Sequence, residues 1–169
     1  LDKEMALVAS HIGPDRKAVQ LHLGGGTPTF FSPDELRQLM TMLRSHFDFT
    51  PDAELGVEID PRTVRDGTLA MLAELGFNRN SFGVQDFDPA VQQAINRIQP
   101  LEMVEKAVED SRKAKFVSIN ADLIYGLLRQ TLESFSRTLD SMFCVAPDRH
   151  ALYNYALFHA CFNSQRLKQ

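Results

Sequence analysis

Cysteine is scarce in this sequence of 169 residues, and its scarcity argues against a metal site built from these residues. The two cysteines, Cys144 and Cys161, lie 17 positions apart, a spacing that fits no zinc or iron–sulfur pattern. A disulfide is not expected in a reducing compartment, so we expect two buried thiols. No residue of this chain is therefore predicted to bind a metal ion.

Long apolar runs and an excess of basic charge are also missing. No apolar run approaches the roughly 20 residues needed to cross a bilayer, and no signal-peptide pattern opens the chain. The formal net charge of −4 provides no broad basic surface, which argues against nucleic acid and anionic membranes as partners. With 44% hydrophobic and 24% charged residues, the composition is typical of a globular protein. The cytoplasm is the expected location.

The length suits one domain, and no charge block or low-complexity tract divides the chain. The first residue is not an initiator methionine. Leu1, Met5, Leu7 and Val8 already follow helical spacing, as if the sequence began inside a helix. We therefore expect the chain to be a piece of a longer protein.

Strand-like and helix-like segments alternate along the sequence. The predicted strands span residues 18–23, 53–60, 79–85, 118–126 and 151–156. One predicted helix follows a capping box at Ser32, and the next ends near Gly76. A later one spans residues 101–114, and the last starts at Thr131. The apolar stripe of this last helix is Leu132, Phe135, Leu139, Met142 and Phe143. Such βα repeats predict an α/β fold with a parallel sheet.

The most informative stretch is Gly24–Thr29, where the first strand passes into a helix. Its three glycines would let backbone groups approach a ligand closely, although a flexible turn is the alternative for a glycine run taken alone. Polar residues also end the other strands. These residues are Glu58 and Asp60, Gln85 and Asp86, Asn120 and Asp122, and Asn154. Each could be a satisfied core polar group, but together they predict a ligand-binding mouth at the carboxyl ends of the strands.

Several strings resemble one enzyme family. Gly24–Thr29 resembles the GGGTPT motif of radical S-adenosylmethionine (SAM) enzymes, in which the glycines contact the methionine end of SAM. Oxygen-independent coproporphyrinogen III oxidases have similar strings in the same order. They are EIDPR at 58–62, GVQDF at 83–87, NRIQ at 96–99, DLIYG at 122–126 and YNYA at 153–156. The resemblance covers nearly the whole chain.

The resemblance implies a fold and a reaction. Residues 1–169 would be part of a radical SAM core, an open (β/α)6 partial TIM barrel without its first βα unit and without the C-terminal domain. In the family, a [4Fe–4S] cluster receives electrons from a donor and cleaves SAM. The resulting radical attacks the propionates of coproporphyrinogen III, which lose carbon dioxide and become vinyl groups in haem biosynthesis. A monomer is expected.

The resemblance also implies binding residues, but no catalytic residue. Contacts to a first SAM would fall on Gly25 and Glu58. Contacts to a second SAM, or to substrate, would fall on Gly26, Thr27, Gln85, Arg97, Asp122 and Ala156. Arginine is a natural partner for a carboxylate, while a solvated helix arginine is the alternative at position 97.

Departures from the family pattern leave alternatives open. The family's cluster cysteines, CxxxCxxC, lie upstream and are absent here, so these residues alone are not expected to catalyse the reaction. Leu23 replaces a tryptophan, Asn80 an aliphatic residue, Lys115 a glycine, Ala121 a larger residue and Leu128 a proline, and Leu157–His159 replaces HLP. A catalytically dead SAM-binding remnant is one alternative. A haem chaperone of the same superfamily is another, disfavoured by EIDP at 58–61 and GVQDF at 83–87.

Overall fold

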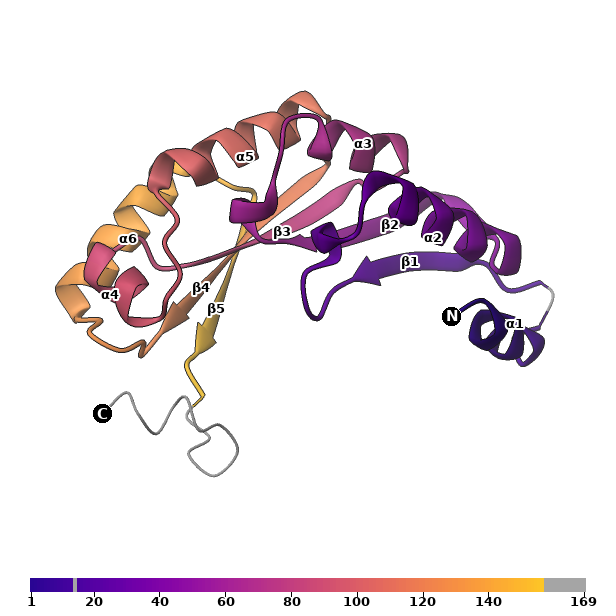
Figure 1. Cartoon of the computed structure of the whole chain (residues 1–169), viewed down its shortest axis with the longest axis horizontal. Coiled ribbons are helices and arrows are strands. Elements are labelled where there is room, and N and C mark those ends of the chain that lie inside the picture. Colours follow the sequence, from indigo (N-terminus) through magenta and orange to yellow (C-terminus); the bar gives the residue numbers. More distant parts are fainter. Residues whose placement is uncertain (14, 157–169) are drawn as a thin grey trace.

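A computed structural model describes residues 1–13 and 15–156, which alternate between strands and helices (Figure 1). None of the described helices combines the length and apolar character that a membrane span requires. The elements are α1 (Asp2–Ser10), β1 (Ala18–Leu23), η1 (Pro28–Phe30), α2 (Pro33–His46), β2 (Phe49–Ile59), η2 (Pro61–Thr63), α3 (Thr68–Glu74), β3 (Arg79–Gln85), α4 (Pro89–Ala94), α5 (Leu101–Lys113), β4 (Ser118–Tyr125), α6 (Leu132–Val145) and β5 (Arg149–Asn154).

The five strands form one sheet in the order β1-β2-β3-β4-β5, and every neighbouring pair is parallel. The sheet is curved, with α2, α3, α5 and α6 along its convex side (Figure 1). This arrangement confirms the predicted α/β fold and its partial-barrel form. Because all strands run the same way, their carboxyl ends meet along one rim.

The core lies between the sheet and the helices. Alternate residues of the strands face it, such as Val57 and Ile59 of β2, which are at most 2% exposed, and Phe82 and Val84 of β3, which are fully buried. The intervening residues face the concave side and are mostly polar. This period of two sends the polar rim residues away from the core.

The predicted helix ends are present. Ser32 Oγ accepts a hydrogen bond from the Glu35 backbone N–H, and the Glu35 side chain accepts one from Ser32 N–H at 2.7 Å, which completes the capping box of α2. Thr131 caps α6 in the same way. Gly76 follows α3 with a φ of +97°, a left-handed conformation that favours glycine.

Four expectations are corrected. The second strand begins at Phe49, not at residue 53, and the last spans Arg149–Asn154 rather than 151–156. In α6, Phe135, Leu139 and Met142 pack against the core as predicted, but Leu132 and Phe143 are 87% and 69% exposed. The helix turns Ser134, Thr138 and Val145 toward the core in place of these two. Cys144 is exposed rather than buried, while Cys161 and the Leu157–His159 string lie outside the described residues.

The structure shows the surroundings of three residues that depart from the sequence pattern given above. Lys115 follows α5 with a φ of +65°, where a side chain is strained. Asn80 is buried against α5 and donates to Ser111 Oγ at 2.8 Å, but its Oδ1 has no partner among the described residues. Ala121 is fully buried in the core.

Candidate functional site

A hollow of about 190 Å³ opens at the rim formed by the carboxyl ends of β1 to β4. Seven of the eight predicted binding residues line it: Gly25, Gly26, Thr27, Glu58, Gln85, Arg97 and Asp122. Ile59, Asp60, Ser81 and Gly83 also line it. The eighth predicted residue, Ala156, lies two positions after β5 and is not among the lining residues.

The glycine loop after β1 is held by the end of β2. Glu58 Oε2 accepts a hydrogen bond from the Gly25 backbone N–H at 3.2 Å. An added Cβ at Gly24 would lie 2.7 Å from Glu58 Oε1, so the Glu58 carboxylate would have to move away from its present position. Gly25 has a φ of +98°, and an added Cβ at Gly25 or Gly26 would meet nothing within 4 Å. The loop therefore offers open space to a ligand, while glycine at position 24 leaves room for the Glu58 carboxylate as it stands.

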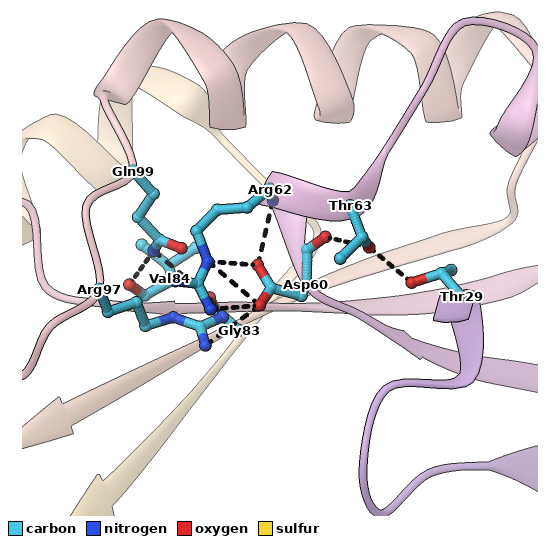
Figure 2. Close-up of polar contacts among 8 residues, drawn as sticks. All are labelled: Thr29, Asp60, Arg62, Thr63, Gly83, Val84, Arg97 and Gln99. Atoms are coloured by element: carbon cyan, nitrogen blue, oxygen red, sulfur yellow. Dashed lines mark hydrogen bonds and ion pairs between the residues drawn. The ribbon is translucent and has the colours of Figure 1, made fainter. Parts of the chain in front are cut away.

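Asp60 connects three loops at the rim (Figure 2). Its carboxylate accepts hydrogen bonds from Arg62 Nε at 3.0 Å and Arg62 Nη2 at 2.7 Å, and lies 3.3 Å from Arg97 Nη1. The Asp60 carbonyl accepts from Thr63 Oγ1 at 2.8 Å, and Thr63 Oγ1 lies 2.6 Å from Thr29 Oγ1. The end of β2 is thereby joined to the segment that follows the glycine loop.

Charge and burial oppose each other at Asp60. Burial alone would raise the pKa of Asp60, but hydrogen bonds from Arg62 and the positive charge of Arg97 hold this pKa below its usual value. Asp60 is therefore ionised at neutral pH. With two guanidinium groups beside one carboxylate, this part of the rim keeps a net positive charge.

Arg97 is a rim residue and not a solvated helix arginine. It follows α4, its side chain is only 21% exposed, and its Nη2 donates to the Gly83 carbonyl at 2.8 Å (Figure 2). Burial lowers the pKa of the Arg97 guanidinium, and the negative charge of Asp60 partly offsets that effect. The guanidinium is thus held at the mouth of the hollow by two oxygen acceptors.

The end of β3 turns sharply at Gln85. Gln85 has a φ of +69°, and the Asp86 N–H bonds back to the Val84 carbonyl at 2.9 Å. An added Cβ at Gly83 would lie 2.9 Å from Gln85 Nε2, so glycine lets the Gln85 side chain fold over the strand. The Gln99 side chain donates to the Gly83 and Val84 carbonyls from behind.

Asp122 belongs to a small network across β3 and β4. Its two carboxylate oxygens accept hydrogen bonds from Ser81 Oγ at 2.8 Å and from Asn120 Nδ2 at 2.7 Å. Burial raises the pKa of Asp122, and the nearby charge of Glu58 adds to this rise, while the hydrogen bonds oppose it. The two carboxylates give this side of the hollow a negative character, opposite the two arginines.

Asp86 does not face the hollow, contrary to the predicted mouth. It is fully buried and accepts hydrogen bonds from Thr138 Oγ1 at 2.8 Å, Gln130 Nε2 at 2.6 Å and the Asp88 N–H at 2.6 Å. These bonds tie the end of β3 to α6 and to the turn after β4. Asp86 therefore stabilises the end of β3 from the protein interior.

A second, larger hollow of about 600 Å³ lies on the side of the glycine loop next to β1. Gly26 and Thr27 line both hollows. Leu23 lines the larger one with His22, Phe30 and Phe31. A ligand at the glycine loop therefore has room to extend beyond the smaller hollow.

Comparison with known proteins identifies the family. The sequence model of the radical SAM superfamily matches residues 2–142. The chain belongs to this superfamily.

The chain is similar to oxygen-independent coproporphyrinogen III oxidases. It is 48% identical over 168 residues to the oxygen-independent coproporphyrinogen III oxidase of Pseudomonas aeruginosa, and 48% identical over 157 residues to that of Helicobacter pylori J99. These matches cover 98% and 92% of this chain, but 36% and 34% of the relatives. The chain thus spans about a third of the length of these curated relatives.

A solved structure supports the same grouping. The coproporphyrinogen III oxidase of Escherichia coli, a radical SAM enzyme, superimposes with a TM-score of 0.93 at 42% identity, over 98% of this chain and 38% of that one. The methyltransferase TsrM of Kitasatospora setae, with a TM-score of 0.67 at 15% identity, shares the fold only.

One residue beside the rim, and the surroundings of two others, were not predicted from the sequence. Asp60 and Asp86 were recognised as strand-end polar residues, but neither the pairing of Asp60 with Arg97 nor the burial of Asp86 was visible in the sequence. His22 was missed, although its Nε2 lies 3.2 Å from Glu58 Oε1. Its place on the same strand face as Gln20, shortly before the glycines, was the available signal.

Proposed function

We propose that this chain is part of an oxygen-independent coproporphyrinogen III oxidase and that the rim hollow binds SAM. The proposed reaction is the oxidative decarboxylation of the propionates of coproporphyrinogen III to vinyl groups. The observation that carries the proposal is the meeting of seven predicted binding residues in one hollow. The chain that holds them is 48% identical to enzymes named for this reaction.

The residues present fit SAM. Its methionine end carries an amino group and a carboxylate, and its ribose carries two hydroxyls. Glu58 and Asp122 supply acceptors for the amino group and the hydroxyls, and Arg97 supplies a guanidinium for a carboxylate. The open space at Gly25 and Gly26 allows close backbone contact.

The role of each residue follows from its surroundings. Glu58 keeps one oxygen on the Gly25 N–H and presents a partly exposed carboxylate, so it both shapes the glycine loop and can contact the ligand. Arg97 is fixed by Asp60 and the Gly83 carbonyl, which reduces the entropy lost when it binds an anion. When bound with a [4Fe–4S] cluster, SAM supplies the radical that abstracts hydrogen from the substrate.

The described residues do not fit the cluster itself. Among residues 1–13 and 15–156, no group of three or more histidine, cysteine, aspartate or glutamate side chains is placed to hold a metal. We propose that the complete natural protein supplies the cluster ligands from residues outside this chain. A CxxxCxxC motif upstream of Leu1 in the gene would agree with this proposal.

The remaining proposals concern the whole protein. Residues 1–169 would form part of a radical SAM core, preceded by a first βα unit and followed by a C-terminal domain. An electron donor would serve the cluster, and the protein would act as a monomer in the cytoplasm. A catalytically dead SAM-binding remnant is the second candidate, favoured by the strained Lys115 and by Asn80 Oδ1, which has no partner in the part of the chain that the structure describes.

The test is SAM binding by calorimetry and anaerobic turnover of coproporphyrinogen III, using the complete natural protein after cluster reconstitution. Glu58→Ala should weaken SAM binding about tenfold or more, since a hydrogen bond to a charged group contributes roughly 1.5–3 kcal/mol. Glu54→Ala is the matched control. Glu54 faces the same side of β2 but pairs with Arg79 and does not line the hollow, so binding should not change.

The outcomes separate the alternatives. Turnover with SAM binding supports the oxidase, and SAM binding without turnover supports the remnant. No SAM binding by the unsubstituted protein would overturn both. Equal affinities of Glu58→Ala and the unsubstituted protein would overturn the site assignment alone. The 169 residues by themselves are expected to bind SAM only near millimolar, since the cluster that anchors SAM in the family is absent.

A further inference from the structure

His22 of β1 faces the concave side of the sheet. Its Nε2 lies 3.2 Å from Glu58 Oε1, while the other oxygen of Glu58 accepts the Gly25 N–H at 3.2 Å. Since a carboxylate only accepts, the hydrogen of this contact lies on His22 Nε2. The Glu58 carboxylate is therefore held at both oxygens, by the imidazole on one side and the glycine loop on the other.

Two glycines make room for the imidazole ring. An added Cβ at Gly56, on the neighbouring strand β2, would lie 3.0 Å from His22 Nδ1. An added Cβ at Gly24 would lie 3.0 Å from His22 Nε2. Both contacts are tighter than most real Cβ contacts, so a side chain at either position would push the ring from its present place. The two glycines together form a seat for the ring.

The space taken by the His22 ring explains why residue 56 is a glycine, which contact with a ligand in the hollow does not explain. Gly56 lies in the middle of β2, with no positive φ, and it does not line the hollow. Glycine inside a strand weakens it, and it is favoured where another group must approach closely. Here the approaching group is the His22 ring, which turns Nε2 toward Glu58.

We propose that His22 is a positioning residue that acts on the ligand through Glu58. It does not line the rim hollow, although it lines the larger hollow on the β1 side of the glycine loop. Its hydrogen bond restricts the rotamers of the Glu58 side chain, which is otherwise partly exposed and, within residues 1–13 and 15–156, held only by the Gly25 N–H. The carboxylate is thereby set in place before a ligand binds. This inference rests on the proposed function, in which Glu58 contacts SAM.

The test is a double-mutant cycle on SAM affinity, measured by calorimetry on the complete natural protein with its cluster. His22→Ala should weaken binding about tenfold, near the middle of the range for residues in one hydrogen-bond network. Glu58→Ala combined with His22→Ala should bind no more weakly than Glu58→Ala alone. His22→Gln, which keeps a donor near Nε2, should restore much of the affinity.

Gly56→Ala provides an independent test of the role of His22. In the unsubstituted protein its methyl group should displace the ring and weaken SAM binding. In the His22→Ala background the methyl group has no ring to displace, so affinity should not fall further. Circular dichroism and thermal unfolding of each variant establish that the fold is kept.

Each outcome decides a separate point. Additive losses in the double variant, or unchanged affinity in His22→Ala, would overturn the role of His22 and leave the SAM site standing. Failure of the unsubstituted protein to bind SAM would overturn the proposed function and this inference together. Loss of binding in His22→Ala that Gln fails to restore, with a lower melting temperature, would show a structural role instead.

Discussion

At the scale of single residues, the rim depends on Asp60, whose one carboxylate serves two guanidinium groups. Arg62 binds it with Nε and Nη2, and Arg97 approaches from another loop (Figure 2). Arg97 is mostly buried, and a buried cation without a partner is costly. Removing the charge of Asp60 therefore affects two cations at once.

We expect Asp60→Asn to lower the free energy of unfolding by about 2 kcal/mol at neutral pH, since charge-assisted hydrogen bonds contribute roughly 1.5–3 kcal/mol. The pKa of Asp60 is lowered in the fold, so its contribution is present above the unfolded-state pKa. It is lost as the pH falls through the folded-state pKa, and the two proteins should converge in acid. Urea unfolding at a series of pH values measures the difference.

Asp34→Asn is the control for this pH series. Asp34 also pairs with an arginine, Arg37, but its side chain is 96% exposed, so its substitution should change stability little at any pH. A constant difference between Asp60→Asn and the unsubstituted protein across the pH series would contradict the electrostatic explanation.

Asn80 offers a second prediction at this scale. Its Oδ1 is buried without a partner among the described residues, and its only described partner, Ser111, also donates to the Ala107 carbonyl. Asn80→Val should therefore raise the free energy of unfolding by about 1 kcal/mol, because it removes a buried, unsatisfied acceptor. Chemical denaturation measures the change.

Asn78→Val is the matched contrast. The Asn78 amide is satisfied at both ends, by Leu55 N–H at 3.0 Å and the Ala53 carbonyl at 2.8 Å, so its loss should destabilise by about 1–3 kcal/mol. If Asn80→Val is destabilising as well, an unseen partner such as water satisfies Oδ1.

At the scale of elements, local rules predicted most boundaries correctly. The capping box at Ser32 and the glycine after α3 are short-range signals, and both are present. The buried face of α6 was predicted only in part. Phe135, Leu139 and Met142 lie against the core, but apolar spacing also favoured Leu132 and Phe143, which are exposed. The structure buries Thr138 instead, whose hydroxyl donates to the buried Asp86, and a partner 52 positions away leaves no local trace.

The candidate site likewise combines residues that the sequence predicts with pairings that it does not predict. Gly25, Gly26 and Glu58 were predictable because the glycine motif and the strand period locate them at the rim. Their surroundings were not, since His22 meets Glu58 across two strands and Arg97 meets Asp60 across two loops. Pairings of this kind depend on strand register and on the path of the chain after α4, which sequence periodicity does not encode.

The turn after β4 carries a prediction of its own. The Gln130 N–H bonds to the Leu127 carbonyl at 3.1 Å, and Arg129 has a φ of +64°, as the third residue of a type II turn does. Leu128 occupies the second position, where proline is favoured, and its N–H makes no hydrogen bond within the described residues. Leu128→Pro should stabilise by about 0.4–1 kcal/mol through the unfolded state.

Two further variants test the turn in denaturant melts. Arg129→Pro should be strongly destabilising, because proline cannot adopt a positive φ. Leu128→Ala separates the loss of the leucine side chain from the effect of the proline ring. A loss of stability in Leu128→Pro larger than in Leu128→Ala would contradict the assigned turn.

At the scale of the whole molecule, the sheet leaves one edge of β1 without a strand. Within the described residues β1 pairs only with β2, and Val19 of β1 is 61% exposed. An exposed parallel strand with free N–H and carbonyl groups can pair with a strand of another chain. Self-association of the 169-residue chain is thus expected at this edge when the chain is studied alone.

Val19→Lys should therefore slow the aggregation of the isolated 169-residue chain, because a lysine on an edge strand opposes pairing with a second copy. Val117→Lys is the control, since Val117 is 74% exposed but precedes β4 in the middle of the sheet. Both substitutions change the net charge from −4 to −3 (−4 + 1), so a general charge effect would be equal in the two. Light scattering over time at fixed protein concentration compares them. If both variants aggregate at the same rate, the edge of β1 is not the site of association, and the exposed face of α6 around Leu132 and Phe143 becomes the surface to substitute next.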